Sequence, residues 1–131
     1  MSQTPLIVII DDDASVREAL QGLLHAVGFT TEAFSSAEAF LQSGRLDDTA
    51  CLITDIQLRG MSGLQLQAHL SASGARIPII IITALPGDGA RALAAGAVCF
   101  LTKPVISEDL LTCIRWALDR SHGDPTNPRQ D

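Results

Sequence analysis

The sequence predicts a doubly wound α/β fold, in which a five-stranded parallel sheet is covered on both faces by five helices. Three short runs consist mostly of Ile, Val and Leu without alternation, namely Leu6–Ile10, Cys51–Thr54 and Ile77–Ile82. Continuous apolar runs of this length are typical of strands buried on both faces of a parallel sheet. Helical patterns alternate with the strands, and a strand–helix unit repeated five times favours right-handed crossover connections.

The remaining elements follow from the same patterns. Val98–Leu101 is a fourth apolar strand, and Phe29–Phe34 is more polar and alternates, as suits a strand at the edge of a sheet. We expect helices at Ala14–Val27, from Ser35 to about Gln42, at Gly63–Ser73, at Asp88–Ala95 and from Ser107 to about Arg120. Ser35 and Glu38 have the spacing of a capping box, which would start the second helix.

The composition indicates one acidic domain. The chain has 131 residues and a formal net charge of -6, so it has the length for one domain with a real core, and its charge argues against direct binding to nucleic acid or an anionic membrane. Residues 1–120 would form the domain, and residues 121–131, with two prolines, a linker or disordered tail.

Cys51, Cys99 and Cys113 lie in apolar stretches, where we expect buried free thiols. Without a signal peptide pattern or an apolar run near the ~20 residues of a membrane span, a cytoplasmic location is expected.

Each buried strand is followed by a residue that can carry chemistry. Asp11, Asp12 and Asp13 follow the first strand, and Asp55, Thr83 and Lys103 follow the later ones. The carboxyl ends of parallel strands share one edge, which is where open α/β sheets bind their ligands. We therefore expect these carboxylates, the hydroxyl and the ammonium to converge there.

Converging carboxylates need a shared proton or a cation, because like charges a few ångströms apart repel. An all-oxygen cluster without His or Cys favours a hard ion, and Mg²⁺ held by carboxylates, waters and a phosphate is the natural choice. Lys103 is the only lysine in the chain, and it could pair with Asp55 or with a phosphoryl oxygen. Together with Thr83 and Mg²⁺, it would stabilise a phosphoryl group during transfer to a carboxylate.

These segments resemble a known family. Ile9 to Asp13, Leu52 to Asp55, Ile82 to Ala84 and Phe100 to Pro104, in this order, are similar to the receiver domain of bacterial two-component response regulators. Asp13–Arg17, Arg59 to Leu64 and Ala95 to Ala97 resemble the FixJ-like subgroup, whose receivers often precede a DNA-binding output domain. The resemblance covers residues 5 to 120 and implies a flavodoxin-like strand order of 2-1-3-4-5.

The resemblance implies a role for each matching residue. Asp55 would be the phosphoacceptor, served by a sensor histidine kinase, and Asp12, Asp55 and the backbone carbonyl of Gln57 would bind Mg²⁺ directly, with Asp11 acting largely through water. Lys103 would pair with the phosphoryl group, and the Lys103–Pro104 peptide bond would be cis. Thr83 and Phe100 would be the switch residues, which connect the site to a surface made of the fourth helix, fifth strand and fifth helix.

The implied role is a phosphorylation-activated signalling switch in transcription regulation, not an enzyme beyond its own phosphorylation and dephosphorylation. A phosphorylation-dependent homodimer and a C-terminal DNA-binding output domain are further expected partners. Residues 119–131 would be either the start of a linker to that domain or the end of a stand-alone receiver. The segment from Thr83 to Lys103 is short for the subgroup by roughly half a helical turn, which falls on the fourth helix.

Three other interpretations remain open on the residues alone. A haloacid-dehalogenase-like phosphatase also uses a strand-end aspartate, a Thr and a Lys, but it needs a further acid pair, and only Glu108 and Asp109 follow the lysine closely. A pseudo-receiver would be an interaction module that is never phosphorylated, and it would be signalled by a lost acid, Thr or Lys. Finally, Asp11 and Asp12 alone could be helix-starting acids, and Phe100 could be a core residue rather than a switch.

Overall fold

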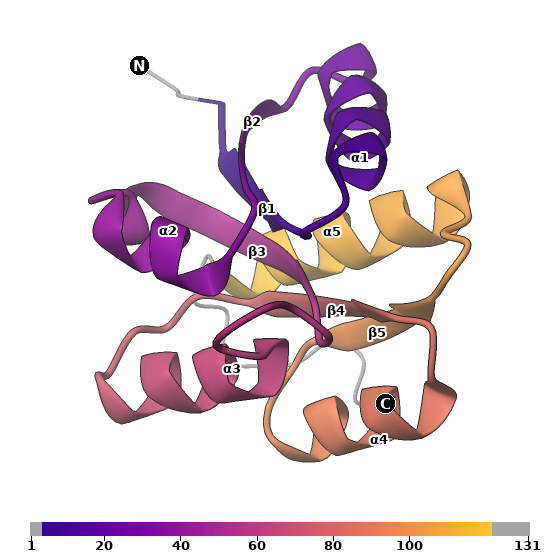
Figure 1. Ribbon diagram of the computed structural model, residues 1–131. Helices are drawn as coiled ribbons and strands as arrows, with labels where there is room; N and C mark the ends of the chain where they lie inside the picture. Colours follow the sequence, from indigo (N-terminus) through magenta and orange to yellow (C-terminus); the bar gives the residue numbers. More distant parts are fainter. Residues whose placement is uncertain (1–3, 122–131) are drawn as a thin grey trace.

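The computed structural model describes residues 4–121, which form a central sheet between two layers of helices (Figure 1). The five strands are parallel and lie in the order β2-β1-β3-β4-β5, which confirms the predicted fold class and topology. Their bounds are β1 Leu6–Ile10, β2 Thr30–Phe34, β3 Thr49–Asp55, β4 Ile79–Thr83 and β5 Cys99–Thr102. The predicted tail lies outside the described residues, apart from the end of the last helix.

Five α-helices cover the two faces of the sheet (Figure 1). The helices α1 (Ala14–Ala26) and α5 (Ser107–Ser121) pack on one face, where Leu20, Leu24 and Ile114 are among the buried residues. The other face is covered by α2 (Ala37–Gln42), α3 (Gly63–Ala72) and α4 (Pro86–Ala94), and a short 3₁₀ turn, η1 (Leu46–Asp48), precedes β3.

The two faces have separate cores because successive side chains of a strand point to opposite faces. In β1, Ile7 and Ile9 pack with α1 and α5, while Val8 and Ile10 pack with α2 and α3. All four side chains are essentially inaccessible to solvent, and burying each contributes roughly 1.5–3 kcal/mol to stability. The central strands therefore need apolar residues at every position, and polar residues are left to the strand ends.

The second helix begins one residue later than the capping box predicts. Ser36, not Ser35, is the N-cap of α2, and its hydroxyl accepts a hydrogen bond from the amide of Ala39. Glu38 therefore does not cap its own helix; its carboxylate accepts from the backbone N–H of Met61, 2.8 Å away in the β3–α3 loop. The prediction was wrong because a contact distant in sequence competes with the local one.

The fourth helix begins at Pro86, two residues before the predicted start at Asp88. Proline is favoured in the first turn of a helix because its fixed φ suits the helix and its missing N–H would have no partner there. Gly89 then lies inside α4, where glycine is normally unfavourable. Its lack of a side chain is required here, since a Cβ atom would overlap the ring of Phe100.

Two cysteines depart from the prediction of free thiols. Cys99 on β5 and Cys113 on α5 form a disulfide, with Cα atoms 6.5 Å apart. Cys51 on β3 is buried and free as predicted, and burial raises the pKa of its thiol to about 12. Within residues 4–121, no helix combines the length and apolar character required to cross a membrane.

Gly89→Ala should destabilise the protein even though alanine is the better helix former. The added methyl group must displace the Phe100 ring, and overpacking of this kind costs about 1–3 kcal/mol. Gly87→Ala is a matched control in the same helix, because nothing lies within 4 Å of its Cβ position; it should stabilise by about 0.5–1 kcal/mol. Urea unfolding of both variants measures the difference, and equal stabilisation by both would contradict the contact with Phe100.

The cysteine arrangement predicts the pattern of alkylation. Native protein should resist iodoacetamide at neutral pH, because the one free thiol is buried and its high pKa leaves almost no thiolate. Protein unfolded without reductant should take one label, at Cys51, and protein unfolded with reductant should take three. Peptide mass mapping locates the labels, and labelling of Cys99 before reduction would disprove the disulfide.

Candidate functional site

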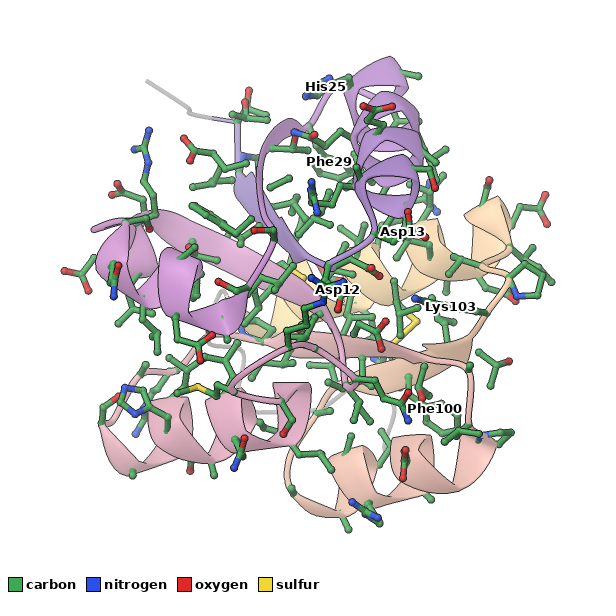
Figure 2. The ribbon with its side chains drawn as sticks, in the orientation of Figure 1. Asp12, Asp13, His25, Phe29, Phe100 and Lys103 are labelled. Carbon is green, nitrogen blue, oxygen red and sulfur yellow. A yellow bond between two sulfur atoms is a disulfide. The ribbon has the colours of Figure 1, made fainter. Side chains whose placement is uncertain are left out.

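The ends of β1, β3 and β5 meet at the side chain of Lys103. Its ammonium nitrogen lies 2.7 Å from Oδ2 of Asp55 and 3.1 Å from Oδ2 of Asp11. Figure 2 shows Lys103 at the same edge of the sheet as Asp12 and Asp13. The convergence expected from the sequence is therefore present for two of the aspartates and for the lysine.

The ion triad of Lys103, Asp11 and Asp55 is largely buried, so its charges interact more strongly than charges on the surface would. The side chain of Asp11 is 2% exposed and that of Asp55 is 9% exposed, whereas Lys103 retains 27%. Desolvation raises the pKa of Asp11, against the opposing effects of the Asp13 amide and Lys103. Partial burial would lower the pKa of Lys103, but its bonds to Asp55 and Asp11 outweigh this and raise the pKa. One ammonium thus faces two carboxyl groups, so the formal charge of a single lysine cannot balance that of both.

The three consecutive aspartates have three different environments. Asp11 is buried against Lys103, and its Oδ1 also accepts from the amide of Asp13. Asp13 is the N-cap of α1; its carboxylate accepts from the amide and hydroxyl of Ser15, and the hydroxyl bond is the main reason that its pKa is lowered. Asp12 is exposed and is the member free to face a ligand from solvent. The N-cap of α1 is therefore Asp13, a residue that the helix-start interpretation of Asp11 and Asp12 did not include.

The backbone that follows β3 helps to orient the carboxylate of Asp55. Oδ1 of Asp55 accepts from the amide of Gln57, 3.0 Å away, while Oδ2 bonds to Lys103. The amide of Gly63 donates to the carbonyl of Ile56, and a capping box between Ser62 and Gln65 starts α3. Both carboxylate oxygens of Asp55 are thus oriented, and Gln57 follows it on the same loop.

Thr83 and Phe100, the predicted switch residues, lie on the neighbouring strands β4 and β5. The hydroxyl of Thr83 is fully buried; it accepts from the amide of Leu85 at 3.0 Å, and the carbonyl of Leu85 is 3.4 Å away. Leu85 is the N-cap of α4, so this hydroxyl touches the start of that helix. Phe100 is half-buried and packs against α4 (Figure 2). The peptide bond between Lys103 and Pro104 is cis, as the resemblance implied.

Two residues near the site were missed by the sequence reasoning. Arg17 on α1 donates from Nη1 to the backbone carbonyl of Asp11 at 2.7 Å, and Glu38 holds the amide of Met61 in the loop after Asp55. Both contact the backbone, so no complementary side chain in the sequence pointed to them. Only the position of Arg17, one helical turn after the N-cap Asp13, could have suggested that its side chain reaches back to the end of β1.

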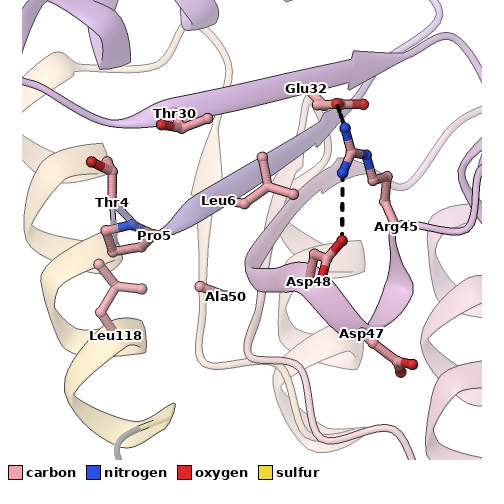
Figure 3. A pocket seen from close by; sticks show the side chains of 10 residues that line it. All are labelled: Thr4, Pro5, Leu6, Thr30, Glu32, Arg45, Asp47, Asp48, Ala50 and Leu118. Atoms are coloured by element: carbon pink, nitrogen blue, oxygen red, sulfur yellow. Dashed lines mark hydrogen bonds and ion pairs between the residues drawn. The ribbon is translucent and has the colours of Figure 1, made fainter. Parts of the chain in front are cut away.

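A hollow of about 750 Å³ lies at the opposite edge of the sheet, beside the starts of β1 and β2 (Figure 3). Its only cationic lining residue, Arg45, is paired with Glu32 at 2.7 Å and with Asp48 at 3.4 Å. These side chains are well exposed, and such pairs contribute little to stability. The acidic site at the carboxyl ends of the strands is the better candidate, because its charges are buried and come from three separate strands.

The donor atoms at this site fit a hard cation. Within residues 4–121, no three His, Cys, Asp or Glu side chains are grouped closely enough to hold a metal by themselves. Mg²⁺, however, is commonly held by one or two carboxylates, with water and phosphate oxygens completing its shell. Asp11 and Asp55 supply two converging carboxylates, Asp12 is an exposed third carboxylate nearby in sequence, and Gln57 lies on the loop that follows Asp55, to which its N–H donates.

Comparison with known proteins gives one consistent result. A family model described as the response regulator receiver domain matches residues 7–115. The response regulator protein TodT of Pseudomonas putida is 45% identical over 116 residues, which cover 86% of this chain and 51% of TodT. The chain thus spans about half the length of the curated relatives it matches.

Solved structures agree with the sequence relatives. The response regulator StyR superposes with a TM-score of 0.83 at 41% identity, covering 92% of this chain and 62% of that one. A structure titled FixJ-N has a TM-score of 0.81 at 33% identity, with coverage of 90% and 96%. The match to FixJ-N covers nearly the whole of both chains, and it agrees with the FixJ-like resemblance of the sequence.

Replacing Lys103 should make stability depend on Mg²⁺. Lys103→Met leaves two buried carboxylates without their cation, which should lower the free energy of unfolding by about 1–3 kcal/mol in EDTA. Saturating Mg²⁺ should restore part of that loss, because it replaces the missing positive charge, whereas Lys103→Arg should show a smaller loss. Urea unfolding with and without Mg²⁺ measures this, and a loss that Mg²⁺ leaves unchanged would argue against a cation site here.

Proposed function

Because the chain belongs to the response regulator receiver domain family, we propose that it is a phosphorylation-activated switch with Asp55 as its phosphoacceptor. Receiver domains are signalling domains rather than enzymes in the usual sense. The observation that carries the assignment to Asp55 is its geometry: a buried carboxylate at the end of the central strand β3, held by one lysine and one backbone amide.

The proposed reaction moves a phosphoryl group from a phosphohistidine of a sensor histidine kinase. An oxygen of Asp55 attacks phosphorus, the P–N bond breaks, and the imidazole leaves with the electron pair of that bond. Lys103 is close enough to Asp55 to exchange a carboxylate contact for one with a phosphoryl oxygen. Hydrolysis of the acyl phosphate, with water as the second acceptor, returns the free carboxylate and resets the switch.

Asp12, Asp55 and the carbonyl of Gln57 would hold Mg²⁺, with Asp11 acting largely through water. When bound, Mg²⁺ supplies positive charge that neutralises the phosphoryl oxygens during transfer. The excess negative charge at Asp11 and Asp55 supports this assignment, since a phosphoryl group could not approach the cluster without added positive charge. The residues of this chain supply the nucleophile, its orientation and the ammonium.

The response to phosphorylation would pass through Thr83. Its hydroxyl now bonds to the backbone of Leu85, the N-cap of α4. A phosphoryl oxygen on Asp55 that attracted this hydroxyl would break that bond and loosen the start of α4. Phe100, packed over Gly89 of the same helix, would then shift with it, so that the surface of α4, β5 and α5 changes.

The output is proposed to be control of transcription. Relatives include proteins named as transcriptional regulatory proteins, FixJ and TdiR, and the matched region is about half of each. A DNA-binding output domain would then be the effector in such an assembly, with this acidic domain as its regulator, and the changed surface could also support a phosphorylation-dependent homodimer.

Intact mass after incubation with acetyl phosphate tests the acceptor. Wild type should gain the mass of one phosphoryl group only when Mg²⁺ is present, and hydroxylamine should remove it. Asp55→Asn should gain nothing, because an amide oxygen is a far weaker nucleophile than a carboxylate. Asp47→Asn is the control, since it changes an exposed carboxylate at the far edge of the sheet and should be labelled like wild type. An adduct on Asp55→Asn would disprove the assignment, and no adduct on any protein would favour an interaction module that is never phosphorylated.

A further inference from the structure

We propose that Glu38 is a positioning residue for the metal site: from α2 it fixes the β3–α3 loop and thereby the backbone carbonyl of Gln57. The inference rests on the proposed function, because it concerns the same Mg²⁺ site. Glu38 lies on α2, which carries none of the proposed metal ligands, and it is 23 residues away in sequence from Met61, whose backbone N–H it binds.

The contact is direct and strong for its type. Oε2 of Glu38 accepts from the backbone N–H of Met61 at 2.8 Å. An ionised acceptor makes such a bond roughly twice as strong as a neutral one. Glu38 is half-buried, which protects the bond from competing water more than a fully exposed position would.

The loop is shaped to receive this carboxylate. Gly60, immediately before Met61, has φ +77, a conformation that side chains other than glycine rarely adopt. A Cβ atom at Gly60 would lie 2.6 Å from Oε2 of Glu38. The backbone therefore approaches the carboxylate as closely as it does only because residue 60 has no side chain.

The same loop carries the Gln57 carbonyl that is proposed to bind the metal. It leaves β3 at Asp55, passes through Gln57 and enters α3 at Gly63. The Gln57 end is held by the Asp55 carboxylate and the α3 end by the Ser62 capping box, while Leu58 and Met61 pack on the core. Glu38 adds a polar anchor from another helix between these ends. Without it the loop should sample more conformations, and the Gln57 carbonyl should be less well ordered for a ligand.

The test measures Mg²⁺ affinity of the unphosphorylated full chain by titration calorimetry, with Met61 amide hydrogen exchange in metal-free protein as a second readout. Glu38→Ala should raise the dissociation constant for Mg²⁺ about tenfold, the lower end for residues that orient metal ligands, and should speed exchange at Met61. Glu38→Gln keeps an acceptor oxygen and should stay within about threefold of wild type. Glu18→Ala removes an exposed carboxylate from α1 and controls for loss of charge alone.

A glycine pair provides a second route if Glu38→Ala does not fold. Gly60→Ala should weaken Mg²⁺ binding, because its methyl group would displace the Glu38 carboxylate from its position against the loop. Gly44→Ala is the matched control: its φ of +79 imposes a similar backbone penalty, but nothing lies within 4 Å of its Cβ position. It should lower stability without changing the dissociation constant.

The outcomes separate this inference from the proposed function. Wild type that binds Mg²⁺, with weakened Glu38→Ala and near-normal Glu38→Gln, supports positioning. Equal affinity in wild type and Glu38→Ala overturns it while leaving the phosphoacceptor proposal intact. Equal weakening in Glu38→Ala, Glu38→Gln and Glu18→Ala also overturns it, since loss of charge alone would then explain the effect. If wild type binds no Mg²⁺, the proposed metal site fails and this inference fails with it.

Discussion

The contact of Lys103 with Asp11 and Asp55 is the interaction around which the carboxyl edge of the sheet is arranged. A sheet covered on both faces can tolerate charge only where its strands end, because burying an unpaired charge costs far more than a domain can supply. Three strands, β1, β3 and β5, must therefore end in register for one ammonium to reach both acids. The lysine links strands that are far apart in sequence, and any slip in register would leave a buried carboxylate without its cationic partner.

This requirement explains why so much of the site could be predicted from sequence. Apolar runs buried on both faces identify a parallel sheet, and a parallel sheet gathers its strand ends at one edge, so Asp55, Lys103 and Thr83 follow from pattern and topology alone. What could not be predicted depends on distances that no local pattern encodes. Ser36 rather than Ser35 caps α2, while Glu38 is engaged with Met61, and the glycine inside α4 is explained only by the Phe100 ring that lies against Gly89. The pairing of Cys99 with Cys113 is of the same kind, since it depends on how α5 packs on β5.

The glycine-rich start of α4 is a further consequence of packing. By propensity alone, two glycines in a nine-residue helix should weaken it by about 1 kcal/mol each. One of them, Gly89, exchanges that cost for contact with the Phe100 ring, while Gly87 has no such contact. In the switch proposed for Thr83, the first turn of α4 is the part expected to move, because it precedes the contact of Gly89 with the Phe100 ring.

Two hydrogen bonds connect the site to the elements around it, and their strengths differ in a way that suits a switch. Thr83 bonds to Leu85 at the start of α4 through neutral groups, a type worth about 0.5–1.5 kcal/mol, whereas Glu38 bonds to Met61 through a carboxylate, a type worth about 1.5–3 kcal/mol. A phosphoryl group on Asp55 would be a stronger acceptor than a backbone group, so the neutral Thr83–Leu85 bond is the one that would be exchanged. The Glu38–Met61 bond would persist and keep the β3–α3 loop in place. Phosphorylation would then move α4 while the atoms proposed to bind the metal and the phosphoryl group stay fixed.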